Sequence, residues 1–378
     1  MFIYILMSLS IIILTVIISV LWLISWSKKP DADYVLKFIA KNPQRSSLII
    51  IKNGKSLANV NANERKPLAS TVKIMIAIEF SQQAANGSIN PDEKVHLDDL
   101  ARFYVSHTDG GAHEKWLIEM EKHGFLQDRS VSLMNIAKGM MSHSSNANTE
   151  YLMMRLGLEN INKNVNKLEL PQHEKLFPFV SALFIPYEVA LNKGLDITNK
   201  QDTKKILAHI QEMSQEAYIN EAIKIHQKLS QDVNGEYKEC VNIREWYNSE
   251  FDKINSKRFT HSTTSEYISI LEQMNRGSYF PSHVWAYLQP IIEWPMKFEN
   301  NQARFKHVGG KGGSTASILT YAFYAEDKEG NKMELAAFFN DIEGYETMKL
   351  SNSSSAFQLA MFTGGAEWET KLHSILHE

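Results

Sequence analysis

The densest run of hydrophobic positions lies at the start of the chain. Residues 1–27 carry no charged side chain and are dominated by Ile, Leu, Val, Phe and Trp. A helix needs about 20 predominantly apolar residues to cross a bilayer. Lys28 and Lys29 follow this run, and the small-residue cleavage site of a secretory signal peptide does not precede them. The pattern therefore predicts an uncleaved transmembrane anchor over residues 1–27.

Short stretches with strand character lie near both ends of the remaining chain. Ser47–Lys52 and Ser56–Val60 flank Asn53-Gly54, a dipeptide that strongly favours a two-residue hairpin. Ser317–Ala325 and Met333–Asn340 flank a second polar turn. Helical patterns fill most of the middle, so we expect strands from the two ends to form one antiparallel sheet with helices packed on it. The predicted fold class is mixed α/β.

The rest of the chain is expected to form a short linker and one large domain. Residues 28–34 have the composition of a linker, and residues 35–378 are long enough for a single domain with a sizeable core. Within it, the polar stretch Lys204–Leu229 is rich in lysine and glutamine. This stretch predicts a helical insertion at the surface over about 197–260, where insertions are tolerated.

Composition and charge exclude several classes of function. The chain has 378 residues, 22% of them charged, with a formal net charge of -3, whereas a nucleic-acid-binding protein would show a basic patch or a high pI. Cys240 is the only cysteine, so an internal disulfide framework is impossible and no Cys-His cluster indicates zinc. We therefore expect no metal, no cofactor and no nucleic-acid partner.

Ser70 and Lys73 form a Ser-x-x-Lys motif in front of a continuously apolar run. A serine hydroxyl is a weak nucleophile until a base removes its proton. If Ser70 starts a helix, Lys73 lies one turn further along the same face, and burial would lower the pKa of its amine toward that of a useful base. An ordinary capped helix would show the same spacing, and the motif also occurs at Ser25–Lys28. The motif alone therefore does not establish catalysis.

Ser144-Ser145-Asn146 lies between two predicted helices. The Ser144 hydroxyl could relay a proton to a leaving group, and the Asn146 amide could hold a substrate amide. The same residues could simply cap a helix.

Lys311-Gly312-Gly313-Ser314 precedes a late predicted strand. Glycine here would let a substrate lie close to the strand edge, and Lys311 would attract a substrate carboxylate. The backbone N–H of Ser314 could form an oxyanion hole together with that of Ser70. Lys-x-Gly also occurs at Lys52 and Lys328, so this motif is weak in isolation.

The three motifs in this order resemble those of the class A β-lactamase and penicillin-binding protein superfamily. The resemblance extends over most of residues 35–378 and is most specific in Leu68-Ala69-Ser70-Thr71-Val72-Lys73. It implies a five-stranded antiparallel sheet flanked by helices, a helical subdomain, and an active site between them. It also implies residue roles: acylation of Ser70, proton transfer by Lys73 and Ser144, and substrate binding by Asn146, Lys311, Gly313 and Ser314.

The chain departs from the family pattern at several positions. Gly312 stands where a Thr or Ser is usual, and Ser145 stands where an Asp is usual. Glu188-Val189-Ala190-Leu191-Asn192 matches the Glu-x-x-Leu-Asn pattern of the acid that activates the deacylating water, although it lies further from Asn146 than expected. His173 and Glu174 are weaker candidates for that role.

The resemblance leaves the activity open among three alternatives. The first is a serine hydrolase that opens a β-lactam amide through an acyl-enzyme at Ser70. The second is a D,D-peptidase or esterase of the same fold, acting on a cell-wall peptide or an ester. The third is a non-catalytic penicillin-binding sensor module. Gly312 and the distance of Glu188 favour the second alternative, and the overall similarity favours the first.

The resemblance also bears on location. Lys28 and Lys29 would favour a cytoplasmic body by the positive-inside rule, whereas members of this superfamily act outside the cytoplasmic membrane. We therefore expect a single-pass inner-membrane protein whose catalytic domain faces the extracytoplasmic side.

Overall fold

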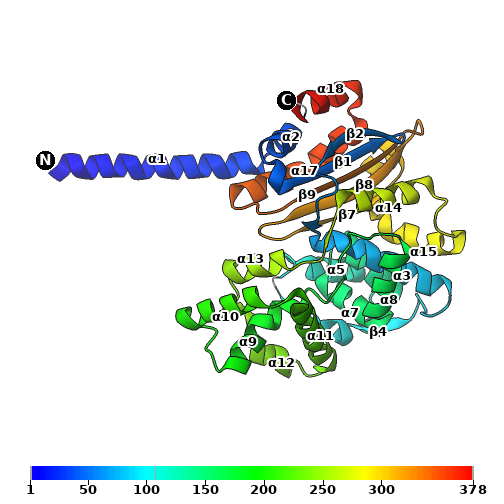
Figure 1. Cartoon of the computed structure of the whole chain (residues 1–378), viewed down its shortest axis with the longest axis horizontal. Helices are drawn as coiled ribbons and strands as arrows, with labels where there is room; N and C mark the ends of the chain where they lie inside the picture. The colour runs from blue at the N-terminus through cyan, green and yellow to red at the C-terminus, as the bar shows by residue number, and fades with distance from the viewer. Residues whose placement is uncertain (1, 107, 377–378) are drawn as a thin grey trace.

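A five-stranded antiparallel sheet forms the centre of the protein (Figure 1). The computed structural model describes residues 2–106 and 108–376, with side chains from residue 11 onward. The strand order is β2-β1-β9-β8-β7. The five strands are β1 (Ser46–Lys52), β2 (Lys55–Val60), β7 (Phe305–Ser314), β8 (Leu319–Asp327) and β9 (Lys332–Phe339). The expected fold class, with strands from both ends of the chain in one sheet, is confirmed.

The predicted hairpin joins β1 and β2. Asn53 and Gly54 have φ angles of 51° and 77°, the left-handed conformation that a tight two-residue hairpin requires. The other edge of β1 pairs with β9, with Leu48 opposite Ala337. The two ends of the chain are therefore held together by main-chain hydrogen bonds at the middle of the sheet.

Three helices from the chain ends cover one face of the sheet. They bury a cluster that includes Val35, Leu36, Leu335 and Phe357. These helices are α2 (Ala32–Lys41), α17 (Tyr345–Thr363) and α18 (Gly365–Leu376).

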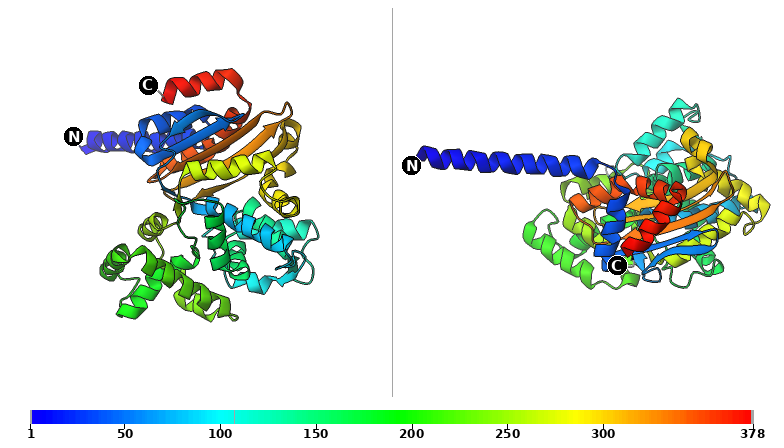
Figure 2. Two further views of the ribbon diagram at one scale, coloured as in Figure 1. Left: turned by 45° about the vertical axis from the view of Figure 1, so that its right-hand side comes forward. Right: turned by 90° about the horizontal axis from the view of Figure 1, so that it is seen from above.

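The opposite face carries α14 and a helical subdomain (Figure 2). Helix α14 (Thr264–Arg276) begins at the cap Thr263, whose side chain accepts from Glu266 N. The subdomain contains α3 (Lys73–Ala85), α4 (Leu97–Ala101), α5 (Ala112–Lys122), α6 (Leu133–Ser142), α7 (Asn146–Leu156), α8 (Leu158–Lys167) and α15 (Ser282–Ile292). Two small two-stranded sheets add to it: β3 (Lys66–Pro67) with β6 (His261–Ser262), and β4 (Lys94–His96) with β5 (Ser130–Ser132).

The polar region after residue 196 is helical, and several of its residues pack into the main core. The stretch Lys204–Leu229, expected as one long helix, is divided because Ser214 caps a new helix with a hydrogen bond from Ala217 N. Ile206, Ala222 and Ile225 are fully buried and belong to the main core. The helices of this region are α10 (Lys200–Glu212), α11 (Gln215–Gln231), α12 (Glu236–Val241) and α13 (Ser249–Lys257), and α9 (Ile185–Lys193) precedes it.

Helix α1 (Phe2–Lys28) projects away from the body (Figure 1). Among the described residues, it is the one helix long and apolar enough to cross a membrane. Its C-terminal end is docked on α17, where the buried Lys349 amine donates to the carbonyls of Trp26 and Lys29 at 3.2 and 2.7 Å. Asn352 donates to the carbonyl of Ser27 at 3.1 Å. The last carbonyls of α1 are therefore capped by the body.

Candidate active site

Ser70 lies in a 3₁₀ turn, η2 (Ala69–Val72), that leads into α3. The sequence suggested that Ser70 opens the helix, but the α-helix begins at Lys73. The preceding residue, Ala69, has a φ of 44°, a left-handed conformation that costs energy for a residue with a Cβ. The turn is held by Leu68 N, which donates to Thr260 O at 3.0 Å. Strain at this position is typical of a functional site.

The structure places the Lys73 amine beside the second motif. Lys73 is fully buried, and its Nζ donates to Ser144 O at 2.7 Å, Asn146 Oδ1 at 3.0 Å and Ser144 Oγ at 3.2 Å. The Phe179 ring covers the amine from 5.8 Å. The amine thus contacts polar atoms of two residues that the sequence singled out, Ser144 and Asn146.

Burial lowers the pKa of Lys73 well below its usual value, and the nearby charge of Lys311 lowers it further. Asp109 and Glu150 oppose the shift without reversing it. Desolvation favours the neutral form of an amine. A neutral Lys73 can accept a proton, as a general base must.

Ser144 adopts a left-handed backbone with a φ of 68°. In this conformation, the carbonyl and the hydroxyl of Ser144 both lie within hydrogen-bonding distance of Lys73 Nζ. The next residue, Ser145, is fully buried; it accepts from Asn148 N at 3.2 Å and contacts His113 Nδ1 at 2.9 Å. Ser145 is therefore the N-cap of α7.

The edge strand β7 passes directly in front of Ser70. A Cβ at Gly313 would lie 2.4 Å from Ser70 N and 2.8 Å from Thr71 N, so only glycine fits. Thr71 and Thr320 hydroxyls lie 2.7 Å apart and link the turn to β8. The close approach at Gly313 is thus to the backbone of the Ser70 turn, and the approach of a substrate to this strand stays a prediction. Ser314, one residue further along the strand, lines the same cavity.

Lys311 is buried, and burial lowers its pKa to about 7. Its Nζ donates to Gly312 O at 2.6 Å. In the part of the chain that the structure describes, no salt bridge joins this amine to a carboxylate. The amine is therefore available for an acidic group on a ligand.

A cavity of about 690 Å³ brings these residues together, within the usual size range of small-molecule sites. Ser70, Ser144, Asn146, Lys311 and two glycines of β7, Gly312 and Gly313, line it. Among the described residues of its lining, Asp109 is the single acidic side chain. Asp109 and Phe179 were not predicted from the sequence, because each is an isolated residue in a loop with no motif around it.

The candidate deacylating acids lie elsewhere. Glu188 is buried on α9, where it accepts from Lys228 at 2.8 Å and pairs with Tyr237. Glu174 pairs with His261 at 3.2 Å, and His173 contacts the Glu174 carbonyl. None of the three described residues lines the cavity. The side chain that covers the Lys73 amine is the aromatic ring of Phe179.

A buried carboxylate fixes the loop that carries Phe179. Glu150 is fully buried and accepts from Val180 N at 2.8 Å and from the Ser181 hydroxyl at 2.6 Å. Its other partner is His226 Nδ1, at 2.7 Å. Because His226 belongs to α11, the region expected to be a surface insertion supports the wall of the site.

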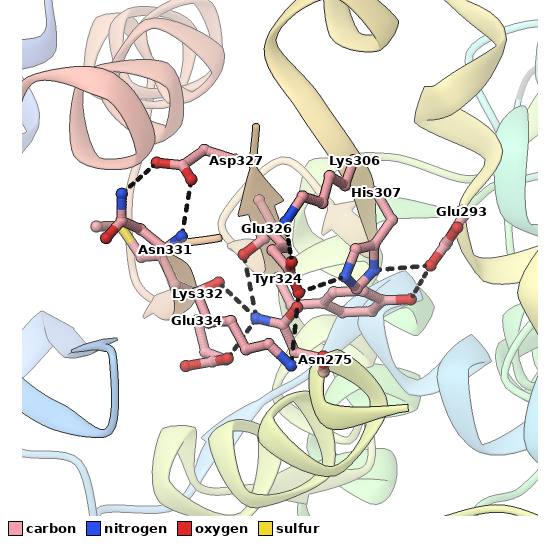
Figure 3. Close-up of polar contacts among 12 residues, drawn as sticks. Asn275, Glu293, Lys306, His307, Tyr324, Glu326, Asp327, Asn331, Lys332 and Glu334 are labelled. Carbon is pink, nitrogen blue, oxygen red and sulfur yellow. Dashed lines mark hydrogen bonds and ion pairs between the residues drawn. The ribbon is translucent and has the colours of Figure 1, made fainter. Parts of the chain in front are cut away.

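A separate polar cluster holds the outer side of β7 in place (Figure 3). Glu293 contacts His307 Nδ1 and the Tyr324 hydroxyl, both at 3.1 Å. The next residue, Trp294, in the turn η5 (Trp294–Lys297), donates from Nε1 to Gly310 O at 2.9 Å. Burial opposes protonation of His307, but hydrogen bonds to Glu293 and Glu326 outweigh it and raise its pKa. The cluster positions the strand that carries Lys311.

Comparison with known proteins gives a family for this arrangement. A model described as the beta-lactamase enzyme family matches residues 32–250. A beta-lactamase from Chitinophaga pinensis has a similar structure, with 12% identity, a TM-score of 0.50, and coverage of 87% of this chain and 99% of that chain. A beta-lactamase from Sphaerobacter thermophilus gives 13% identity, a TM-score of 0.50, and coverage of 87% and 96%. At these identities the two structures show a shared fold alone. A search of curated protein sequences gave no significant match.

Proposed function

The chain belongs to the beta-lactamase enzyme family, and from this we propose that Ser70 is the nucleophile of a serine acyl-transfer enzyme that uses Lys73 as its base. One observation carries the proposal: the buried Lys73 amine lies within hydrogen-bonding distance of Ser144 and Asn146, and these two residues line a cavity together with Ser70. The proposed substrate has an amide or ester carbonyl and a carboxylate, as β-lactams and cell-wall peptides do.

In the proposed reaction, neutral Lys73 takes the proton of the Ser70 hydroxyl while Ser70 Oγ attacks the substrate carbonyl. The C–O bond to Ser70 forms and the C–N bond of a lactam or peptide breaks. The Ser144 hydroxyl, 3.2 Å from Lys73 Nζ, passes a proton to the departing nitrogen. Backbone N–H groups of Ser70 and Ser314 would stabilise the oxyanion. Lys311 would bind the substrate carboxylate, and Asn146 the substrate amide.

The lining of the cavity contains few groups that could promote release of the acyl group from Ser70. Hydrolysis of an acyl-enzyme needs a base that activates water, and in the described lining Asp109 is the one acid present. Asp109 accepts from the backbone of Ala112 and His113 at 3.1 and 3.2 Å, as a helix cap does. This counts against rapid β-lactam hydrolysis. With β-lactams we expect an acyl-enzyme that forms readily and persists.

The test uses the full chain in detergent, a fluorescent penicillin and a chromogenic cephalosporin. The proposal expects a covalent adduct that Ser70→Ala abolishes, with little turnover of the cephalosporin. Rapid turnover would instead establish the β-lactamase alternative. A stable adduct together with no turnover of any peptide or ester would favour the sensor alternative. Absence of an adduct with penicillins and with phosphonate probes would refute Ser70 as the nucleophile.

We also propose that α1 is an uncleaved anchor and that the body lies on the extracytoplasmic side of the inner membrane. The contacts between Lys349, Asn352 and the end of α1 support an anchor, because cleavage near residue 27 would remove the Trp26 carbonyl from the buried Lys349 and the Ser27 carbonyl from Asn352. Membrane fractions should contain the full-length chain. A C-terminal reporter active only in the cytoplasm would contradict the proposed orientation.

A further inference from the structure

The end of α1 carries aromatic rings that make contact with the body. Trp22 and Trp26 lie one turn apart on α1 and are stacked, with their ring centroids 6.5 Å apart. Trp26 also contacts Tyr34 of α2 at 5.4 Å and Tyr345, at the start of α17, at 6.3 Å between centroids. Tryptophan and tyrosine are enriched where a membrane helix meets water. The aromatic residues at this junction therefore come from both the anchor and the body.

Polar contacts hold the end of α1 against α17, and the two helices lie side by side there (Figure 1). The Lys349 amine, which donates to the Trp26 carbonyl, also lies 4.5 Å from the centre of the Trp26 ring, and an aromatic face attracts a cation. The Ser27 hydroxyl donates to Met348 Sδ at 2.9 Å, and Asn352 donates to the Ser27 carbonyl at 3.1 Å. These contacts fix the direction in which α1 leaves the body.

Two large apolar side chains of the body are exposed beside this junction. Tyr345 is 49% exposed and Met348 is 40% exposed. Both lie in the first turn of α17, and both contact α1, the first through the Trp26 ring and the second through the Ser27 hydroxyl. Exposed apolar patches often mark surfaces that bind protein or membrane. Because this patch is continuous with a helix apolar enough to cross a membrane, lipid is the partner that its position favours.

The charged groups around the patch are compatible with a lipid surface. The two acidic residues nearest to Tyr345 in the sequence both form salt bridges, Glu343 with Lys253 and Glu346 with Arg45. Lys28 and Lys29 at the end of α1 are exposed, and neither forms a salt bridge within the described part of the chain. Basic side chains next to a membrane helix are attracted to anionic headgroups. The local charge therefore favours contact with an anionic lipid surface.

We propose that the start of α17 lies in the headgroup layer of the bilayer that α1 crosses, with Tyr345 and Met348 in contact with lipid. The inference rests on the proposed anchor and is independent of the reaction proposed for Ser70. Because the end of α1 is fixed to α17, the body is held at one height and in one orientation on the membrane surface.

The test places a nitroxide label at single cysteines of the full chain in vesicles of phosphatidylcholine and phosphatidylglycerol. Cys240→Ser first removes the exposed native cysteine. The labelled variants are Tyr345→Cys and Met348→Cys, with Leu14→Cys as the reference within α1 and Tyr279→Cys as the matched control. Tyr279 is 44% exposed and precedes α15, which lies on the side of the body away from α1 (Figure 1). Collision rates with oxygen, which concentrates in the bilayer, and with a water-soluble nickel chelate report the depth of each label.

We expect the ratio of oxygen to nickel collisions at positions 345 and 348 to be several-fold higher than at position 279. The ratio at position 14 should be higher still, because that label lies in the hydrocarbon region. If the label at position 348 lowers the melting temperature, the label at position 345 alone decides.

Three results would overturn the inference. Ratios at positions 345 and 348 equal to that at position 279, with the label at position 14 in lipid, would show that the body stands away from the membrane. Protection of positions 345 and 348 from both reagents would mean that protein, such as a second copy of the chain, covers the patch. A nickel-accessible label at position 14 would refute the anchor itself. No outcome depends on Ser70, because none of the labelled positions lines the cavity.

Discussion

The amine of Lys73 contacts Ser144 twice, donating to its carbonyl at 2.7 Å and to its hydroxyl at 3.2 Å. The left-handed backbone of Ser144 accompanies this double contact. It fixes the amine between the turn that carries Ser70 and the hydroxyl that would pass on the proton. The same contacts and the burial of Lys73 suggest how the site can be tested residue by residue.

Replacement of Lys73 by Met should remove the base and keep most of the buried volume. We expect acylation by a penicillin to slow by about 100- to 10,000-fold, the usual contribution of a general base. The rise of the acylation rate with pH, which reflects deprotonation of Lys73, should disappear as well. Stopped-flow fluorescence gives the rate, with Lys122→Met at an exposed site as the control. An unchanged rate with an unchanged pH profile would exclude Lys73 as the base.

Two neighbouring glycines should respond very differently to alanine. A methyl group at Gly313 would lie 2.4 Å from Ser70 N, and a backbone atom cannot move away without disturbing the turn. At Gly312 the nearest atom is 3.5 Å away. We expect Gly313→Ala to acylate at least tenfold more slowly than Gly312→Ala, while both melt within a few degrees of each other. Similar acylation rates in the two variants would show that β7 is further from Ser70 than described.

Lys311 should make the binding of acidic substrates depend on pH. Because burial lowers its pKa to about 7, the amine is charged below this pH and becomes neutral above it. The dissociation constant of a carboxylate-bearing penicillin should therefore rise between pH 6 and 8 in the Ser70→Ala protein. The methyl ester of the same penicillin is the control and should show no such rise. Lys311→Met should remove the dependence; its persistence there would assign it to another group.

Sequence patterns predicted which segments are helices and strands better than where the helices end and how the strands pair. The Asn53-Gly54 hairpin and the late strands were evident because turn chemistry and hydrophobic runs are local. The break between α10 and α11 was missed, since a capping serine at Ser214 resembles any other polar residue. The pairing of β1 with β9 was expected only as a shared sheet, because register depends on contacts between distant segments.

The site was predictable where short motifs carry the chemistry. Ser70, Ser144, Asn146, Lys311 and Gly313 line one cavity, and the buried Lys73 contacts two of them, Ser144 and Asn146. The sequence could not show that Phe179 covers Lys73 or that Glu188 faces away toward Lys228. Both facts depend on how the loop held by Glu150 packs, and no local pattern encodes that packing.

The free energy of unfolding should depend on pH through Glu334, a residue that is 3% exposed. Its carboxyl group contacts Asn275 (Figure 3). Burial raises its pKa to about 7, and the hydrogen bond from Asn275 offsets this only in part. The folded state therefore prefers the protonated acid. Its contribution to stability is complete below the ordinary pKa of about 4.5 and is lost as pH rises through 7. Glu334→Gln should raise the free energy of unfolding on the order of 2 kcal/mol at pH 8 and change little at pH 4.

Thermal or urea unfolding at the two pH values provides this measurement. Glu329→Gln, on the exposed turn between β8 and β9, is the control and should shift neither midpoint. An equal change at both pH values for Glu334→Gln would attribute the effect to packing instead of protonation.

The pairing of β1 with β9 has a consequence for how the protein is made. Ser70 and Lys73 leave the ribosome long before residues 305–339, which supply β7, β8 and β9. Until then, the edge of β1 that pairs with β9 is open, and Ser70 has neither Gly313 nor Lys311 beside it. A half-synthesised chain thus contains the proposed nucleophile but no assembled site. A product that stops before β7 would be inert, and its open edge would make it prone to aggregation, so activity is confined to chains that have been completed.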